Sequence, residues 1–369
     1  MNKKILFVLH LPPPVHGSSL VGSFIKDSTL INTSFNSKYI NLGTSKSIDE
    51  IGKNGLNKWI LYFKLVFMVI KQFIVYKPNL VYLAMTANGI AFYKDMVIAF
   101  LAKLFGVPLV IHFHNKGVSI NQNKTLDNFL YKLVFKNTKV IMLSKHLFPD
   151  IKKYVKKDDV YYCPNGIPEI GSNENNVTIK NDTAQLLFLS NLIESKGVYV
   201  LLEALSILKS KAISFSCNFV GGIGDITEET FSNKVSSLQL QDCVQYLGKK
   251  FNQEKTDIFK RSDIFVLPTF YHNECFPLVL LEASQFKLPM VSTFEGAIPE
   301  IIDDGVNGFL VPKKDARALA DKLEALIKNE SLRTNLGQEA YKKYENEYTL
   351  TQFESNMRSI LKSINEEKN

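Results

Sequence analysis

Short apolar runs alternate along this chain with longer stretches of helical periodicity. Nearly continuous apolar strands separated by helices are typical of parallel sheets covered on both faces. The pattern therefore predicts an α/β fold built from doubly wound sheets. Nine runs are predicted to be strands: residues 5–11, 80–85, 108–114, 139–144, 185–190, 214–222, 244–248, 264–268 and 289–293.

A polar, asparagine-rich stretch at residues 164–183 separates the first four predicted strands from the other five. The chain has 369 residues, which exceeds what one hydrophobic core usually covers. We therefore predict two domains, residues 1–165 and 166–345. Residues 346–369 are predicted to form a helix that packs back on the first domain.

Charge is divided unevenly between these two domains. Residues 1–165 hold 22 lysines and no arginine against eight acidic residues, a net charge of +14, so the remainder carries −6. A basic domain is attracted to an anionic surface or ligand. Without arginine, the side chain best suited to base edges and phosphates, a nucleic-acid partner is not expected. An anionic membrane surface and simple solvation of the lysines both stay open.

Residues 58–77 are the most membrane-like segment, but charged residues interrupt them and no transmembrane helix is predicted. The apolar run at the N-terminus is too short for a secretory signal, and the four cysteines form no C-x-x-C pair. We expect a cytoplasmic protein. Peripheral contact with the inner face of the cell membrane is an alternative, because lysines and aromatic residues share one helical stripe. These residues are Trp59, Phe63, Lys64, Phe67 and Lys71.

Ligands of doubly wound sheets bind at the carboxyl ends of the strands, so residues directly after the predicted strands are candidates for a site. Gly17 follows the first strand and permits close approach of the backbone. His112 and His114 lie at the end of the strand at 108–114 and share one face, so a substrate contact competes with a structural role. A metal would need a third ligand that local spacing does not offer, and no metal is expected.

Two carboxylates in "YHNECFPLVLLEA" form the strongest candidate. Pro277 suits a helix start, which puts Glu274 in the preceding loop and Glu282 in the second helical turn. Burying Glu282 among leucines is costly unless it is paired. A carboxylate can accept hydrogen bonds from both hydroxyls of a vicinal diol, as in a ribose or hexose. The alternative is an ordinary ion-pair or helix-dipole glutamate.

Lys196 precedes a predicted helix, where a cation suits a diphosphate, although an exposed surface lysine explains it equally well. In "STFEGAIPEII", the backbone N–H groups of Gly296 and Ala297 could cradle phosphate oxygens. Plain turn chemistry is the alternative there.

Taken together, four segments resemble family 4 of the retaining glycosyltransferases, the GT-B-fold enzymes that use nucleotide sugars. They are "NECFPLVLLEA", "SNLIESKGVYVLLEAL", "FEGAIPEIIDDGVNGFLV" and "CPNGI". The resemblance covers the C-terminal half in order and spacing, and more loosely the N-terminal half through "PPPVHGSSLVG" and "VIHFHN". It implies two Rossmann-like domains with a cleft between them.

The resemblance also implies a role for each matching residue. Glu274, Lys196 and His114 would act at the reaction centre, on the transferred sugar and the diphosphate. The acceptor would meet the first domain, with His16 and His112 as candidate contacts. The donor-binding residues would be Gly17, Asn191, Phe276, Glu282, Gly296 and Ala297.

One departure from the family pattern concerns Asn191, which stands where an arginine is usual, so either another cation replaces it or donor affinity is lower. The resemblance implies a metal-independent, cofactor-free, retaining transfer of a hexose or N-acetylhexosamine. The donor would be a UDP- or GDP-sugar and the acceptor a glycan, lipid-linked, in surface polysaccharide biosynthesis. A sugar-nucleotide epimerase of the same fold and a non-catalytic sugar-nucleotide binder remain alternatives. A dinucleotide oxidoreductase is disfavoured, because "VGGIGD" lacks the third glycine of the fingerprint.

Overall fold

A computed structural model describes residues 3–43, 56–170 and 183–366. The chain divides into two compact units: unit 1 comprises Met1–Gly166 with Leu350–Asn369, and unit 2 comprises Ile167–Thr349. Part of the predicted interdomain stretch, residues 171–182, lies outside the described residues.

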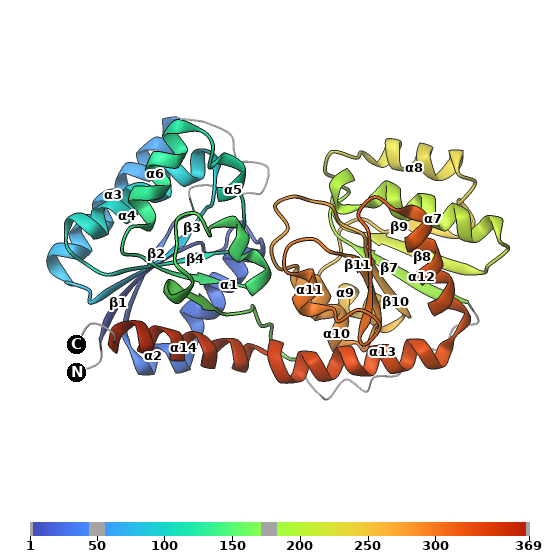
Figure 1. The fold of residues 1–369 in the computed structure, drawn as a ribbon. Coiled ribbons are helices and arrows are strands. Elements are labelled where there is room, and N and C mark those ends of the chain that lie inside the picture. The colour runs from blue at the N-terminus through green and yellow to red at the C-terminus, as the bar shows by residue number, and fades with distance from the viewer. Residues whose placement is uncertain (1–2, 44–55, 171–182, 367–369) are drawn as a thin grey trace. The chain divides into compact units, whose positions relative to one another are not determined.

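Unit 1 contains a six-stranded, entirely parallel sheet in the order β2-β1-β3-β4-β5-β6 (Figure 1). Its centre is fully apolar, because the side chains of residues 5–9 in β1 are at most 1% exposed. The strands are β1 (Lys4–Leu9), β2 (Asn36–Asn41), β3 (Leu80–Met85), β4 (Leu109–Phe113), β5 (Lys139–Met142) and β6 (Val160–Tyr162).

Helices cover both faces of this sheet, with α3, α4 and α6 on one side and α1, α2 and α14 on the other (Figure 1). The C-terminal helix α14 packs on α2, where Arg358 Nε donates to Ser34 Oγ at 2.9 Å. The helices are α1 (Gly17–Asp27), α2 (Thr29–Ser34), α3 (Leu56–Val75), α4 (Gly89–Leu104), α5 (Val118–Asn121), α6 (Thr125–Phe135) and α14 (Leu350–Glu366).

Unit 2 repeats this plan with a second parallel sheet in the order β12-β11-β10-β7-β8-β9. The strands are β7 (Ala184–Leu189), β8 (Phe215–Val220), β9 (Val244–Tyr246), β10 (Ile264–Leu267), β11 (Met290–Thr293) and β12 (Gly308–Val311). The α-helices are α7 (Val198–Ser210), α8 (Glu228–Ser237), α9 (Asn252–Lys260), α10 (Leu278–Gln285), α11 (Ile298–Ile301), α12 (Ala316–Lys328) and α13 (Glu330–Lys343).

All nine predicted strands are confirmed, and three strands were missed: β2, β6 and β12. Each missed strand lies at an edge of its sheet. An edge strand has one neighbour and is partly solvated, so it need not be continuously apolar. In β2, for example, the sequence NSKYIN leaves most side chains partly or fully exposed.

Candidate functional site

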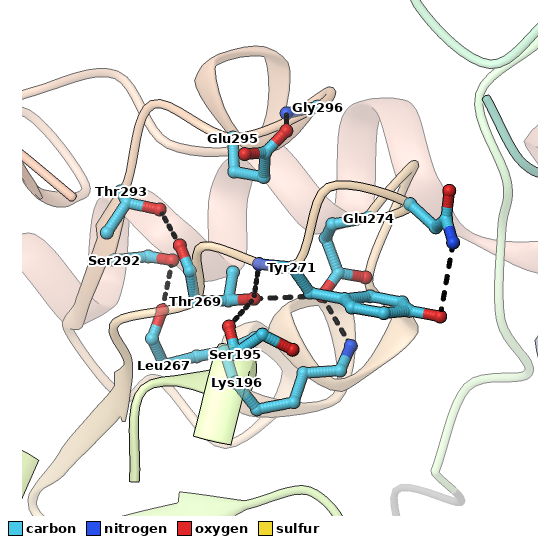
Figure 2. A network of polar contacts seen from close by, with 11 residues as sticks. Ser195, Lys196, Leu267, Thr269, Tyr271, Glu274, Ser292, Thr293, Glu295 and Gly296 are labelled. Carbon is cyan, nitrogen blue, oxygen red and sulfur yellow. Dashed lines mark hydrogen bonds and ion pairs between the residues drawn. The ribbon is translucent and has the colours of Figure 1, made fainter. Parts of the chain in front are cut away.

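The loops that follow β7 and β10 meet at the carboxyl edge of the unit 2 sheet, because these two strands are neighbours. They bring Lys196 and Glu274, 78 positions apart in sequence, into an ion pair with Nζ 2.5 Å from Oε2 (Figure 2). The two side chains are only 17% and 9% exposed. A charge pair this enclosed is costly to desolvate, which is typical of a functional position.

Thr269, directly after β10, holds this pair in place (Figure 2). Its hydroxyl lies 3.4 Å from Glu274 Oε2 and 3.3 Å from the Ser195 carbonyl oxygen, and it accepts from the Tyr271 N–H at 3.2 Å. The Tyr271 ring lies under the lysine, with Nζ 4.8 Å from the ring centroid. Lys196 therefore has a carboxylate on one side and an aromatic face on another.

Gly197 sets the direction of Lys196. It has a left-handed backbone with φ of +89° and begins α7 directly after the short 3₁₀ turn Glu194–Lys196. A Cβ at this position would stand 2.3 Å from the Pro268 carbonyl oxygen. Both conformation and space therefore require glycine, which fixes the lysine against the loop after β10.

Glu282 lies in α10 as predicted, but it is not the buried, unpaired acid that its apolar neighbours suggested. Its side chain is 25% exposed, and Lys255 Nζ from α9 stands 2.7 Å from both carboxylate oxygens. The neighbouring leucines turn into the core while Glu282 faces away from them. Among the described residues, Oε2 nevertheless accepts no well-aligned hydrogen bond and is inaccessible to solvent, as is Asn273 Oδ1 in the Glu274 loop.

The expectation that the Gly296 and Ala297 amides cradle phosphate needs correction. Gly296 N–H donates to its neighbour Glu295 Oε1 at 3.1 Å, and Ala297 N–H donates to the Cys275 carbonyl at 2.8 Å. Neither amide is open. Gly296 has a left-handed φ of +56°, and a Cβ there would meet the Glu274 carbonyl at 2.3 Å. This turn packs against the backbone of the loop that carries Glu274.

Phe276 is also placed differently from its predicted role in donor binding. Its side chain is 5% exposed and packs edge-on against Tyr348, with the ring centroids 5.8 Å apart. Packing in the core of unit 2 therefore explains the aromatic ring at this position.

Asn191 is exposed and accepts the Gly222 N–H through Oδ1 at 3.0 Å. Lys249, which follows β9, lies against the same glycine: a Cβ on Gly222 would stand 2.3 Å from its Cε and 3.3 Å from its Nζ. Among the described residues this lysine forms no ion pair within 4 Å. The ammonium group of Lys249 therefore lies near Asn191, the position where the sequence lacks the expected arginine.

Four histidines cluster at the carboxyl ends of β1 and β4 in unit 1. The rings of His112 and His114 are 4.1 Å apart, and those of His10 and His16 are 5.9 Å apart. His112 lies inside β4 with no exposed surface, and its Nδ1 is 2.5 Å from the Tyr82 hydroxyl. Direct contact between His112 and an acceptor, which the sequence suggested, is incompatible with this burial.

His114 follows β4 and is half-buried, with its Nδ1 lacking a partner among the described residues. Burial, and then the proximity of His10 and His16, lowers its pKa to about 3. Burial lowers the pKa of His10 to about 4 and that of His16 in the same direction. These imidazoles are therefore neutral at physiological pH and act as hydrogen-bonding groups rather than as cations.

The loop after β1 leads into α1, which has His16 as its N-cap and Gly17 as its first residue. Its Nδ1 accepts from Ser19 N–H at 3.3 Å, while Ser19 Oγ accepts from His16 N–H at 2.9 Å, a reciprocal capping box. Gly17 is exposed, and a Cβ there would meet nothing within 4 Å. The fold itself does not require glycine at this position, which leaves open space above the helix start.

Sequence reasoning missed several residues of this site. Thr269 and Lys249 follow predicted strands, so the rule that sites lie at carboxyl ends could have found them. Lys255 and Asn273 carry no local signal. Within the described ranges, no three histidine, cysteine or acidic residues converge on a position suited to a metal ion.

The fold is similar to that of solved glycosyltransferase structures. A glycosyltransferase from Rickettsia africae ESF-5 is similar over 98% of both chains, with a TM-score of 0.74 and 19% identity. Anabaena HepE in complex with UDP is similar over 98% of this chain and 100% of its own, with a TM-score of 0.76 and 16% identity. The chain therefore has the GT-B fold, with two Rossmann-like domains.

In sequence, residues 170–343, just under half of the chain, are similar to the family described as "Glycosyl transferases group 1". The putative colanic acid biosynthesis glycosyltransferase WcaL of Escherichia coli K12 is 34% identical over 145 residues, which is 38% of this chain. That match spans 35% of the relative's length, so it bears on one part of that protein.

Proposed function

We propose that this protein transfers a sugar from a nucleoside diphosphate sugar to a glycan acceptor in the synthesis of a surface polysaccharide. The enclosed Lys196–Glu274 pair at the carboxyl edge of the unit 2 sheet carries this proposal. The family match places both residues inside the matched segment. WcaL and the capsular polysaccharide biosynthesis glycosyltransferase CapM of Staphylococcus aureus, both named for surface polysaccharide synthesis, support the class of product.

The donor is proposed to bind unit 2, with its diphosphate beside Lys196. Glu274 accepts one of the three ammonium protons, so two remain for phosphate oxygens. Lys249 is proposed as the second cation on the diphosphate, in place of the arginine missing at Asn191. UDP bound to HepE supports a uridine nucleotide, with a guanosine nucleotide as the alternative.

During transfer, the bond from the anomeric carbon to the diphosphate oxygen breaks, and a bond to the acceptor oxygen forms. Negative charge grows on the departing diphosphate, so a cation fixed beside it stabilises the transition state. We propose front-face attack with retention, in which the acceptor proton passes to the leaving phosphate. Glu274 is occupied by Lys196, which favours a positioning role on the sugar over a nucleophilic one.

Unit 1 is proposed to supply the acceptor site, with His16, His114 and Gly17 as contacts at its open carboxyl edge. Its net positive charge suits an acceptor that carries a lipid-linked phosphate. A hexose or N-acetylhexosamine donor, catalysis without a metal and a cytoplasmic location complete the proposal. No cofactor is invoked, because the nucleotide sugar itself supplies the activated group.

We expect one nucleoside diphosphate sugar in a panel of UDP- and GDP-sugars to raise the melting temperature of the protein, because the ligand binds only the folded state. With that donor, release of nucleoside diphosphate should require a glycan acceptor. The measurements are thermal shift and a coupled assay for the nucleotide, with and without chelator.

Other outcomes point to the alternative functions. Conversion of the donor without an acceptor would identify an epimerase, and binding without turnover would identify a sugar-nucleotide binder. A thermal shift with NAD alone would identify a dinucleotide enzyme. Each of these results contradicts the proposed transfer.

We propose that Glu282 accepts hydrogen bonds from the ribose hydroxyls of the donor. Glu282→Gln is therefore expected to weaken donor binding about 10- to 100-fold while leaving the maximal rate nearly unchanged, because ribose contacts persist from ground state to transition state. Calorimetry with UDP and with 2′- and 3′-deoxy-UDP tests this directly. Both deoxy nucleotides should bind the wild type more weakly than UDP does. Glu282→Gln should bind all three nucleotides with similar affinity.

Glu254→Gln is a matched control, because Glu254 also pairs with a lysine but its side chain is 65% exposed. It should bind all three nucleotides as the wild type does. Equal discrimination against the deoxy nucleotides by Glu282→Gln and the wild type would remove the ribose role of Glu282.

A further inference from the structure

Helix α3 of unit 1 has an apolar face that no described part of the chain covers. One side of α3 packs into the domain, where Tyr62, Leu65, Val69 and Phe73 are at most 6% exposed. On the opposite side, large apolar side chains are between 45% and 68% exposed. We call this face the α3 surface and define it by Trp59, Ile60, Phe63, Phe67, Ile74 and Val75.

The spacing of these residues makes the α3 surface continuous. Residues 59, 63 and 67 are four apart, and residues 60, 67 and 74 are seven apart, so they follow one stripe along the helix. Surface helices normally present polar residues to solvent, and an exposed apolar stripe marks an interaction site.

The only exposed charges within this stripe are positive. Lys64 and Lys71 are exposed at the same helical face, and the sequence of α3 contains no acidic residue. Lys94 of α4 extends the positive charge, with its Nζ 5.1 Å from the Trp59 ring. Both basic and apolar groups are therefore available to a partner that is anionic outside and apolar within.

Two further exposed apolar residues lie at the end of α4, next to the packed side of α3. Phe73 stacks on Phe105, with centroids 5.0 Å apart and planes 28° from parallel. Phe105 is 41% exposed and its neighbour Leu104 is 80% exposed. Figure 1 shows α3 and α4 on the same side of the unit 1 sheet.

We propose that the α3 surface docks onto an anionic lipid bilayer, with α3 lying in the plane of the interface. Its aromatic and aliphatic side chains enter the boundary between head groups and acyl chains. Lys64 and Lys71 extend along that boundary to reach lipid phosphates. Because the packed side of α3 runs along the domain, the helix meets the membrane lengthwise rather than end-on.

Charge argues against a second copy of the chain as the occupant. A symmetric dimer through this face would place each α3 surface against its own equivalent. Lysines would then face lysines, on a domain with a net charge of +14. The proposal uses no residue of the donor site, so it holds or fails independently of the proposed transfer.

Trp59 gives a direct readout, because it is the only tryptophan in the sequence. We expect its emission to shift to shorter wavelength when vesicles of phosphatidylcholine with about 30% phosphatidylglycerol are added to the full chain at about 50 mM salt. Brominated lipids should quench it. Pure phosphatidylcholine vesicles, or the anionic vesicles at about 500 mM salt, should bind several-fold less in flotation.

Two double variants separate the apolar from the electrostatic contribution. Phe63→Ser with Phe67→Ser should abolish both the emission shift and flotation. Lys64→Ser with Lys71→Ser should weaken binding to anionic vesicles on the order of 10- to 30-fold, given the usual contribution of a lysine near a charged bilayer. Phe251→Ser with Val306→Ser, which changes two exposed apolar residues of unit 2, should bind as the wild type does. Thermal unfolding checks that each variant is folded.

Three results would overturn the proposal. The first is unchanged Trp59 emission and no flotation of the wild type with anionic vesicles at low salt. The second is a dimer in multi-angle light scattering that Phe63→Ser with Phe67→Ser converts to a monomer, which would assign the surface to a second copy. The third is equal loss of vesicle binding in the unit 2 control.

Discussion

Lys196→Met is expected to reduce the rate of sugar transfer by about 10²- to 10³-fold at saturating donor, the usual effect of removing one fixed group that stabilises a developing charge. The substitution keeps the length of the side chain and removes its charge. The rate is measured as acceptor-dependent release of nucleoside diphosphate. A loss of this size in the maximal rate, rather than in donor affinity alone, would indicate action in the transition state.

Stability must be measured in parallel, because Glu274 would be left buried without a charged partner. Breaking an enclosed ion pair from one side costs about 3 to 5 kcal/mol. The double variant Lys196→Met with Glu274→Gln removes both charges and should recover most of that stability but none of the rate. Recovery of both would mean that Lys196 serves only the fold.

Lys249→Ala provides the comparison within the same sheet edge, since Lys249 is exposed. It should leave the melting temperature unchanged and raise the donor concentration needed for half-maximal rate several-fold. If this donor concentration also stayed unchanged, Lys249 would not replace the arginine that is missing at Asn191.

Gly296→Ala is expected to destabilise unit 2 by about 3 kcal/mol or more and to abolish donor binding. About 1 to 2 kcal/mol comes from a left-handed conformation in a residue with a Cβ, and the remainder from its approach to the Glu274 carbonyl at 2.3 Å. The shift moves the loop that holds Glu274 against Lys196. Thermal unfolding and calorimetry with the donor measure the two effects.

Gly305→Ala is the matched control, because Gly305 has a φ of +79° but nothing lies within 4 Å of the position of its Cβ. It should cost only the conformational part, about 1 kcal/mol, and bind the donor normally. If Gly296→Ala behaved like Gly305→Ala in both measurements, the contact between the two loops would have no role in the site.

The described part of the chain also bears on the membrane question raised by the sequence. None of its helices is long and apolar enough to cross a bilayer. The sequence could not distinguish a buried helix with two solvated lysines from an exposed amphipathic one. Which side of α3 meets β2 and α4 decides that, and this depends on tertiary packing.

The sequence by itself determined the class of fold and the region of the site. Nine apolar runs identified nine of the twelve strands, all except three at sheet edges, because a strand buried on both faces must be apolar wherever it lies. The loops that carry Lys196 and Glu274 were also identifiable, since they follow predicted strands. These inferences depend only on local periodicity and on the order of the elements.

Only the tertiary structure decided which side chains meet. It paired Glu274 with Lys196 and Glu282 with Lys255, closed the amides of Gly296 and Ala297, and buried His112. A partner 78 positions away leaves no periodic signal, because its proximity arises from the order of strands in the sheet. The burial of a residue likewise depends on what packs against it. The packing residues come from distant parts of the chain, so the local sequence does not reveal them.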